Sequence, residues 1–570
     1  MNRIRTALAA SFVIVFSFQL RAADSRTRAV HPAMPSYLEL RARYAERLAA
    51  AKAERERVRA TDEVTEENLD ERALVAWDLY WRDHLYIDGH LVGAMADMSR
   101  YLRQYYEIGR NASIASTALS TGSVCPSSGF GTWTSLGPST YAAPIMGKVT
   151  SVYLDPSHPN TAYAGADQGG LFRSANNGTS WTNLTDASHY PSLGVTSIVV
   201  PPLDPNTIYI GTKTGPPGGG VYGFGILKST NGGTTWQEVF ELAKYNAQTQ
   251  FGVADGSAIS KLALHPQDPN TIYALASNYV FRSRDAGATW DTVLSITLPP
   301  QPDPEGCGYR TVDVDILPGQ TGVSDSPVLI STIRTGWNGS PITPCGTARS
   351  FLSTSGGSIG SFQEITSTVL AGSLATRIGA AVQAGNQSEF FIGFNALGVG
   401  TNSLTIEKFD VAKKTITPVG NVSNASAGFW DLEMEFSKLK PTTLYVAGTT
   451  ASRLDLSGGF SSSPISTYWA TDPSSCLPIA KTHADVRAML VAASGTNDVV
   501  VLGTDGGIHK ATLDPATKYT YATANWQDLT GSGLAINEFN DISGLESSPD
   551  ILVGGTWDNG TFEYAAGVWR

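Results

Sequence analysis

The stretch SRDAGATW at residues 283–290 decides the fold, because two near copies precede it: SANNGTSW at 174–181 and STNGGTTW at 229–236. All three fit the pattern S-x-[DN]-x-G-x-x-W. The Asp or Asn side chain accepts hydrogen bonds from neighbouring backbone N–H groups and holds a tight turn. The Gly permits a positive φ, and the Trp offers a large apolar surface. The pattern therefore predicts structural turns that carry Ser174, Asn176, Gly178, Trp181, Ser229, Asn231, Gly233, Trp236, Ser283, Asp285, Gly287 and Trp290.

Each octapeptide lies in a longer unit of four short β-branched or aromatic runs, separated by DPN-type turns and loops. Weaker units continue to the end of the chain. Four strands per unit at this spacing predict the blades of a β-propeller. We therefore expect an all-β fold, a single β-propeller over residues 130–570, with about eight four-stranded blades and with seven or ten as alternatives. The last unit has three strands, so we expect GTWTSLGP at 131–138 to complete it and close the ring.

The octapeptides resemble the Asp-box (BNR) repeats of sialidase-like, sortilin-like and xyloglucan-degrading propellers. Closer still is the resemblance to exported bacterial propeller proteins of unknown activity, through WTSLGP, DPSHPNTAY, HAD, TDGG and GTWDNGT in this order. The sialidase tripeptide Arg-Ile-Pro is absent from the sequence, and Lys148 lies where its arginine is expected. The xyloglucan enzymes use a catalytic Asp from each of two tandem propellers, whereas this chain has room for one. Neither catalytic apparatus is carried over.

The N-terminal part of the sequence differs from the repeats. Residues 1–23 combine Arg3 and Arg5 with an apolar run and small residues, the pattern of a secretory signal peptide. Residues 35–110 carry apolar side chains at helical spacing and predict an α-helical segment, which either docks onto the propeller or binds a partner. Residues 111–129 form a Ser/Thr/Gly-rich linker.

Composition and charge narrow the partners. The net charge of −11 and the lack of a basic stripe in the repeats argue against nucleic acid. Beyond the signal, the sequence has no apolar run long enough for a membrane span. We expect a secreted, monomeric protein without a cofactor or metal, although a structural cation has a place in this fold.

Four cysteines would enter an oxidising compartment after export, and none has the C-x-x-C spacing of a metal or redox site. In propeller topology, Cys307 and Cys345 fall on one face of the fourth blade. The sequence therefore predicts a disulfide between them.

Ligands of propellers usually meet the face that carries the turns between second and third strands, which we call the strand 2–3 face. The predicted topology places Asp167, Asp505 and Asp558 there, with His483, Asp485 and Arg487 at the start of an inner strand. These carboxylates and the histidine are candidates for a catalytic acid/base pair. Asp-Gly and Asn-Gly are also favoured turn residues for backbone reasons alone, which is the alternative explanation.

Aromatic side chains on predicted insertions of the same face are candidates for ligand binding. They are Tyr222, Phe224, Trp337 and Trp430, and Arg487 joins them as a polar candidate. These aromatic residues either stack on sugars or anchor a protein partner, or they plug the mouth of the ring.

Three functions remain open from the sequence. The first is a secreted propeller that binds an extracellular polysaccharide or protein through the strand 2–3 face. The second is a glycoside hydrolase or lyase that uses a carboxylate pair on that face. The third is a scaffold without a small ligand.

Overall fold

The computed structural model describes strands β1 (Tyr86–Ile87) and β2 (His90–Leu91), which form one unit of the chain, and most of residues 147–570, which form another. Within the second unit the described residues exclude 157, 189, 191–192, 214–222, 242–257, 297–307, 336–346, 367–374, 384, 397–402, 424–431, 458–459, 468–481, 538, 546–547, 557–560, 566–567 and 570. The predicted signal and linker and the cysteines lie outside the described residues and stay predictions.

The hairpin β1–β2 is the described part of the predicted helical segment. Tyr86 pairs with Leu91 and Ile87 with His90 in antiparallel register. The rest of residues 35–110 lies outside the described residues, so the helical segment stays a prediction.

The second unit folds into four-stranded antiparallel sheets, each following the chain order from its first to its fourth strand. The first three sheets are β3 (Val149–Leu154), β4 (Ala162–Ala166), β5 (Leu171–Ser174) and β6 (Thr182–Asn183); β7 (Gly194–Val199), β8 (Ile208–Lys213), β9 (Ile226–Ser229) and β10 (Gln237–Phe240); and β11 (Ile259–His265), β12 (Asp268–Ala276), β13 (Tyr279–Ser283) and β14 (Asp291–Ser295). Short 3₁₀ turns lie at Asp186–Ser188 and Val323–Asp325.

The fourth and fifth sheets are joined by one bridge between Ile333 and Arg377. They comprise β15 (Gly308–Ile316), β16 (Val328–Thr335), β17 (Ser350–Ser353) and β18 (Gln363–Glu364), then β19 (Ala375–Ala381), β20 (Glu389–Ala396), β21 (Ser403–Asp410) and β22 (Thr415–Ser423). The sixth, seventh and eighth sheets are β23 (Glu433–Phe436), β24 (Thr443–Ala447), β25 (Ala451–Asp455) and β26 (Ser461–Pro464); β27 (Val486–Ser494), β28 (Asn497–Thr504), β29 (Gly507–Leu513) and β30 (Gln527–Asp528); and β31 (Phe539–Leu545), β32 (Ser548–Thr556), β33 (Thr561–Ala565) and β34 (Val568–Trp569).

Second strands are buried on both faces, as the segments AYAGA of β4 and TLYVA of β24 show. Small and β-branched side chains suit this position, because neighbouring sheets cover both sides of the strand. Glycines allow the closest approach. A Cβ on Gly165 of β4 would lie 2.8 Å from the carbonyl oxygen of Val195 in β7, and one on Gly503 of β28 would lie 2.8 Å from that of Val149 in β3.

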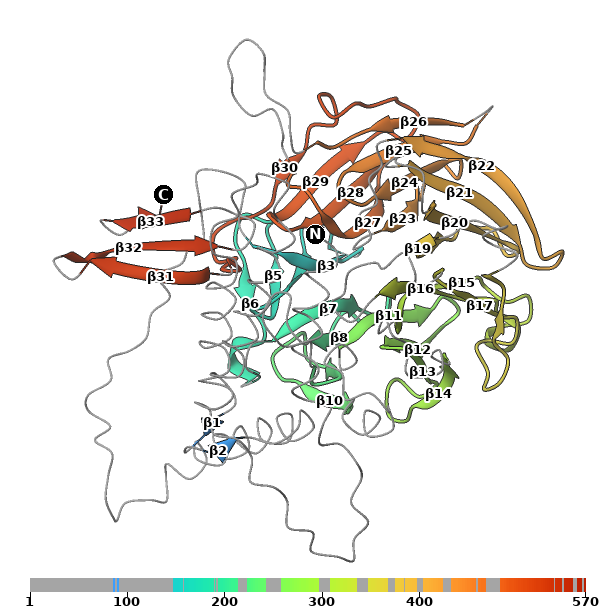
Figure 1. Cartoon of the computed structure of the whole chain (residues 1–570), viewed down its shortest axis with the longest axis horizontal. Helices are drawn as coiled ribbons and strands as arrows, with labels where there is room; N and C mark the ends of the chain where they lie inside the picture. Colours follow the sequence, from blue (N-terminus) through green and yellow to red (C-terminus); the bar gives the residue numbers. More distant parts are fainter. Residues whose placement is uncertain are drawn as a thin grey trace, which may run out of the picture. The chain divides into compact units, whose positions relative to one another are not determined.

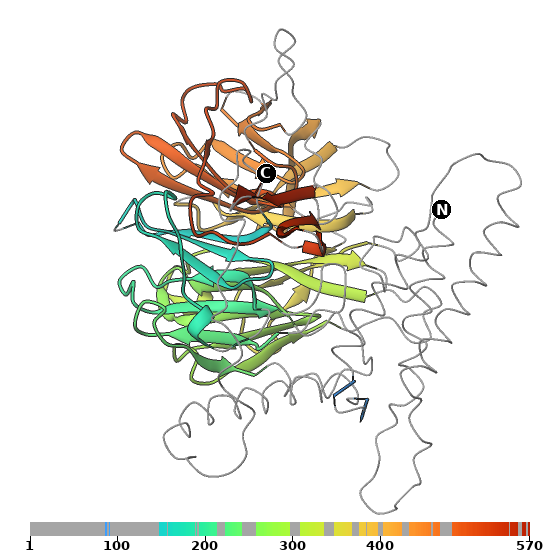
Figure 2. The same cartoon turned by 90° about the vertical axis from the view of Figure 1, so that its left-hand side faces the viewer.

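The first strands form a closed ring. Each of β3, β7, β11, β15, β19, β23 and β27 contacts the next in this order, and β27 contacts β3 (Figure 1). The turned view shows the first sheet, in cyan, between the green and the orange sheets (Figure 2). Val149, Phe172 and Trp181 of the first sheet share a core with Val501 and Ile508 of the seventh. The second unit is therefore a β-propeller whose ring closes between its seventh and first blades.

The ring closes with fewer blades than the expected eight. Eight four-stranded sheets form, but the ring holds seven of them, which was an alternative to the expected eight. The fourth strand of the last sheet is β34, where Tyr564 pairs with Trp569. Residues 131–138, which were expected to complete this sheet, lie outside the described residues. Contacts of residues 529–537 with the first sheet close the ring before β31 begins; for example, the backbone N–H of Trp181 donates to Ser532 O at 2.8 Å.

The octapeptides lie in the turns between third and fourth strands. In the third copy, the backbone N–H of Thr289 donates to Asp285 Oδ1 at 2.8 Å and that of Gly287 to Ser283 Oγ at 2.8 Å. Trp290 Nε1 donates to Val239 O at 3.1 Å, in the fourth strand of the preceding sheet. Trp181 and Trp236 donate in the same way to Leu529 O at 2.9 Å and Leu184 O at 3.0 Å. The seventh sheet therefore packs before the first sheet in the ring, in the position that the second sheet has before the third.

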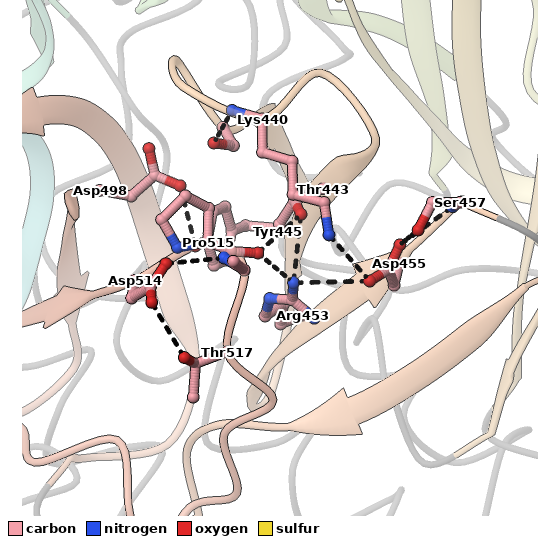
Figure 3. A network of polar contacts seen from close by, with 12 residues as sticks. Lys440, Thr443, Tyr445, Arg453, Asp455, Ser457, Asp498, Asp514, Pro515 and Thr517 are labelled. Atoms are coloured by element: carbon pink, nitrogen blue, oxygen red, sulfur yellow. Dashed lines mark hydrogen bonds and ion pairs between the residues drawn. The ribbon is translucent and has the colours of Figure 1, made fainter. Parts of the chain in front are cut away.

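Side chains of the preceding sheet also donate hydrogen bonds to a backbone carbonyl of the turn. Tyr209 Oη and Lys228 Nζ both donate to Ala286 O, at 2.9 and 3.0 Å. Tyr273 Oη and the guanidinium of Arg282 make the same pair of bonds to Gly356 O. The fully buried Arg453 donates to Pro515 O, and to Thr443 Oγ1 at 3.2 Å (Figure 3). Each turn is therefore held from the sheet before it.

No helix among the residues described is long and apolar enough to cross a membrane.

Replacement of Asp285 by Ala removes the acceptor for the Thr289 backbone and side chain. We expect a loss of about 1 kcal/mol of unfolding free energy, measured by urea denaturation. Asp285→Asn is the matched control, because Asn176 and Asn231 occupy this position in the other copies. At neutral pH the Asn variant should retain nearly full stability. Equal losses in both variants would contradict a role based on the accepted hydrogen bonds.

Deletion of the last sheet tests the closure of the ring. A chain that ends at residue 538 should unfold in one cooperative transition, with a Tm within about 3 °C of the full chain. A chain that ends at residue 528 also loses the partners of Trp181, and its Tm should fall further. Equal damage from both truncations would mean that β31–β34 belong to the ring.

Candidate functional site

Charged side chains gather on the strand 2–3 face of the seventh, first and second sheets. Asp167 follows the second strand β4 directly, and Asp505 follows β28 in the same way. Arg487 lies at the start of β27, Lys148 lies directly before β3, and Lys213 ends β8. First strands begin, and second strands end, at the same edge of an antiparallel sheet. The three consecutive sheets therefore bring these five residues to one face.

Asp505 is the most buried member, with 1% of its side chain exposed. Arg487 Nε donates to its Oδ1 at 2.6 Å, and Arg487 Nη2 donates to its Oδ2 at 2.5 Å. Lys148 Nζ lies 3.9 Å from Oδ2. Such a bidentate pair fixes both partners in orientation. Both oxygens of Asp505 are engaged and are not free to attack a substrate or to deliver a proton.

Asp167 makes a second ion pair, with Lys213 of the next sheet. Its backbone N–H donates to Lys148 O at 3.0 Å, which connects the two ion pairs through one residue. The side chains of Arg487, Lys148 and Lys213 are 19%, 14% and 21% exposed, whereas that of Asp167 is 7% exposed. The solvent-accessible part of this group is therefore cationic.

A pair of histidines lies beside this group at the start of the seventh sheet. His483 Nδ1 lies 3.1 Å from Ala484 O, and the backbone N–H of His483 donates to His509 Nε2 at 3.4 Å. His509 is fully buried on β29, and burial lowers its pKa to about 4, with His483 lowering the pKa further and Asp528 opposing. His509 is therefore neutral at neutral pH, and its Nε2 accepts. His509 was not predicted as a site residue, because nothing in the segment GIHKATL indicates that this side chain is buried.

Asp485 lies in the link between the sixth and seventh sheets. Its φ of 56° is unusual for a residue other than Gly or Asn, and its backbone N–H donates to Thr449 O at 3.1 Å. Asp485 thus anchors this link to the sixth sheet by its backbone. The structure brings Asp505 together with Arg487, and Asp167 together with Lys213, but it does not pair the two predicted carboxylates with each other.

Phe224 is buried, with 4% exposure, and this corrects the expectation of an exposed aromatic. Its ring centroid lies 5.0 Å from that of Tyr190, and it belongs to the core of the first and second sheets. An apolar ring directly before β9 is drawn into the gap between the sheets, where burial stabilises it. The other predicted residues Tyr222, Trp337, Trp430, Asp558, Cys307 and Cys345 lie outside the described residues.

Within the described parts of the chain, no group of three or more His, Cys, Asp or Glu side chains is arranged to hold a metal ion. The polar group on the strand 2–3 face consists of paired cations and carboxylates. Its chemistry is that of charge recognition, since charge-assisted hydrogen bonds to carboxylate or phosphate groups suit exposed Lys and Arg.

The fold and this site define a β-propeller with a charged strand 2–3 face. No protein-family model and no curated protein matches the sequence. Among solved structures, the chain is similar to an ancestral GH74 enzyme, with 17% identity and a TM-score of 0.49 over 75% of this chain and 54% of that one. It is also similar to the GH74 xyloglucanase from Xanthomonas campestris, with 17% identity and a TM-score of 0.47 over 74% of this chain and 59% of that one.

The Dos1 propeller matches 74% of this chain and 92% of its own length, with 13% identity and a TM-score of 0.40. By contrast, the chain spans little more than half the length of the two GH74 enzymes. At these identities the likeness concerns the propeller fold alone.

Removal of one partner from the Arg487–Asp505 pair leaves a buried charge without its main counter-ion. We expect Arg487→Met to lower the unfolding free energy by about 3 kcal/mol. The double variant Arg487→Met/Asp505→Asn removes both charges and should recover a large part of this loss. Urea denaturation of Arg487→Met, Asp505→Asn and the double variant measures the difference. A double variant as unstable as the sum of the single variants would show that the two side chains act independently.

Proposed function

We propose that this chain is an exported propeller that binds an acidic extracellular ligand through the strand 2–3 face. The observation that supports the proposal most directly is the difference in exposure within the ion-pair group. Arg487, Lys148 and Lys213 reach solvent, whereas Asp505 and Asp167 lie beneath them. A ligand that approaches this face meets cationic groups already held in place by buried carboxylates, which lowers the entropic cost of binding.

The ligand that we propose is a polysaccharide with carboxylate groups, and an acidic protein segment is the alternative. Carboxylates accept from Lys and Arg with short charge-assisted hydrogen bonds. The chain as a whole has a net charge of −11, so long-range attraction does not favour an acidic polymer. Recognition then depends on the local cations, and its affinity should decrease as ionic strength rises.

A glycoside hydrolase or lyase is the second candidate from the sequence. Glycoside hydrolysis needs two carboxyl groups about 5 to 10 Å apart on either side of the scissile bond. Asp505 has both oxygens bound by Arg487, and Asp167 is paired with Lys213. These contacts favour binding over hydrolysis at this group. The hydrolase hypothesis then depends on Asp485 and Asp558.

Export and a monomeric state are part of the proposal. The signal-like residues 1–23 support export, and a ring that closes within one chain supports the monomeric state.

The test is a glycan array with the chain lacking residues 1–23, followed by affinity measurements on any acidic polysaccharide that binds. Lys148→Gln should weaken binding by about threefold to fivefold, because one partly solvent-accessible cation is lost. Lys414→Gln is the matched control, since Lys414 is exposed in the turn between β21 and β22 on the opposite face. Its affinity should equal that of the unmodified chain.

A reducing-sugar assay on the same polysaccharide separates the two candidates. Binding without release of reducing ends supports the binding proposal. Release that is lost in Asp485→Asn would replace it by the hydrolase hypothesis. Equal loss of affinity in Lys148→Gln and Lys414→Gln would place binding elsewhere.

A further inference from the structure

A charged cluster occupies the interior of the ring. Lys261 of β11 lies 3.5 Å from Asp313 of β15 and 3.7 Å from Glu433 of β23, measured from Nζ to the carboxylate oxygens. Strands β15 and β19 separate β11 from β23 in the order of the ring. The Lys261–Glu433 ion pair therefore spans the interior between sheets that are not neighbours.

Three carboxylates of this cluster have cationic partners. Asp313 and Glu433 pair with Lys261, and Glu435 pairs with Lys438. Glu435 Oε1 lies 2.5 Å from Lys438 Nζ, and its Oε2 accepts from the backbone N–H of Val491 in β27 at 2.8 Å. Asp313 Oδ2 accepts from the backbone N–H of Ala380 in β19 at 3.3 Å. The cluster thus joins first strands of five consecutive sheets.

Asp315 is the fourth carboxyl group of the cluster, and it forms no ion pair with a cation among the described residues. It lies two residues after Asp313 on β15, and its Oδ2 is buried and accepts no hydrogen bond. Burial raises the pKa of Asp315 well above its ordinary value, and Asp313, Glu433 and Glu435 raise it further while Lys261 opposes them. Glu433 in turn raises the pKa of Lys261 above its usual range, so Lys261 stays charged. A buried carboxylate without a partner costs several kcal/mol, whereas the neutral acid costs much less.

We propose that Lys261, Asp313, Asp315 and Glu433 form a proton-binding plug across the axis of the propeller, in which Asp315 holds one proton while the plug is closed. Loss of this proton adds an uncompensated negative charge beside Asp313 and Glu433, and the ion pairs that span the interior loosen. The ligand of this site is the proton itself. Asp315 Oδ2 is buried and cannot contact a substrate. No group of carboxylates among the described residues is arranged to hold a metal ion.

The direction of the pH dependence follows from the raised pKa. In the unfolded chain Asp315 titrates near the ordinary value of about 4. Its contribution to stability is fully present below that pH and is lost as the pH rises towards the pKa of the folded state. Within this window each pH unit lowers the ratio of folded to unfolded chain by up to about tenfold.

The experiment compares urea unfolding of the full chain with that of Asp315→Asn from pH 4 to pH 9. The Asn side chain keeps the shape and removes the ionisation. The two curves should nearly meet at pH 4, and the advantage of the Asn variant should grow with pH up to a plateau. Parallel curves over the whole range would overturn the proposal.

Asp325→Asn is the matched control, because Asp325 lies in the connection that follows β15. Asp325 is partly exposed, and hydrogen bonds from Thr321 hold its pKa below the ordinary value. Its replacement should bring no advantage that grows at alkaline pH. A stability advantage that grows with pH as much as that of Asp315→Asn would show that the effect comes from the net charge of the chain, and it would contradict the proposal.

Infrared spectroscopy of the folded wild-type chain gives a readout that does not depend on stability. A protonated carboxyl band should be present at pH 7, and it should decrease in Asp315→Asn or, if that variant does not fold, in Asp315→Ser. An unchanged band would show that Asp315 is ionised at pH 7 and would overturn the proposal. These outcomes are independent of any ligand on the strand 2–3 face.

Discussion

The short turn between the third and fourth strands is the point at which neighbouring sheets of this ring are held together. Its backbone carbonyl accepts from side chains of the preceding sheet, as Ala286 O does from Tyr209 and Lys228. Its Trp290 donates back to Val239 O in that same sheet. Two neighbouring sheets are thus connected in both directions through one turn. A rigid turn geometry is required for this, and the Ser and Asp side chains provide it by accepting backbone N–H groups.

Closure at seven blades follows from the same interaction. Trp181 of the first sheet donates to Leu529 O after the seventh, and Lys510 of the seventh sheet contacts Asn177 in the turn of the first. The interface between the seventh and first sheets therefore also depends on the Trp of the turn and on a Lys of the preceding third strand. An eighth blade in the ring would have to separate these partners. The sheet β31–β34 has four strands of its own and leaves this interface intact.

Much of this fold was predictable from the sequence, because local patterns carry it. The three octapeptides predicted the turns, and the four β-branched or aromatic runs in each repeated unit predicted the strands. A fourth turn, at residues 353–362, escaped prediction, since Ser355 takes the place of Asp, Gly360 stands where Trp is expected, and Phe362 follows two residues late. In the structure Ser353 Oγ still accepts from Gly357 N at 3.1 Å. The blade count was not predictable, because closure depends on contacts between residues far apart in the chain.

For the candidate site, the predicted propeller topology placed the charged residues on the correct face, but the sequence pattern could not predict which side chains pair with each other. Arg487 and Asp505 belong to one face by strand direction, but their bidentate contact depends on the register of β27 and β28. The pair formed by Lys261 and Glu433 is harder still, because it joins sheets that are not adjacent. Both groups keep charges in places where apolar side chains of similar volume often give greater stability. The proposed roles give a reason for the charged side chains at these positions. These roles are ligand recognition on the strand 2–3 face and proton binding at the axis.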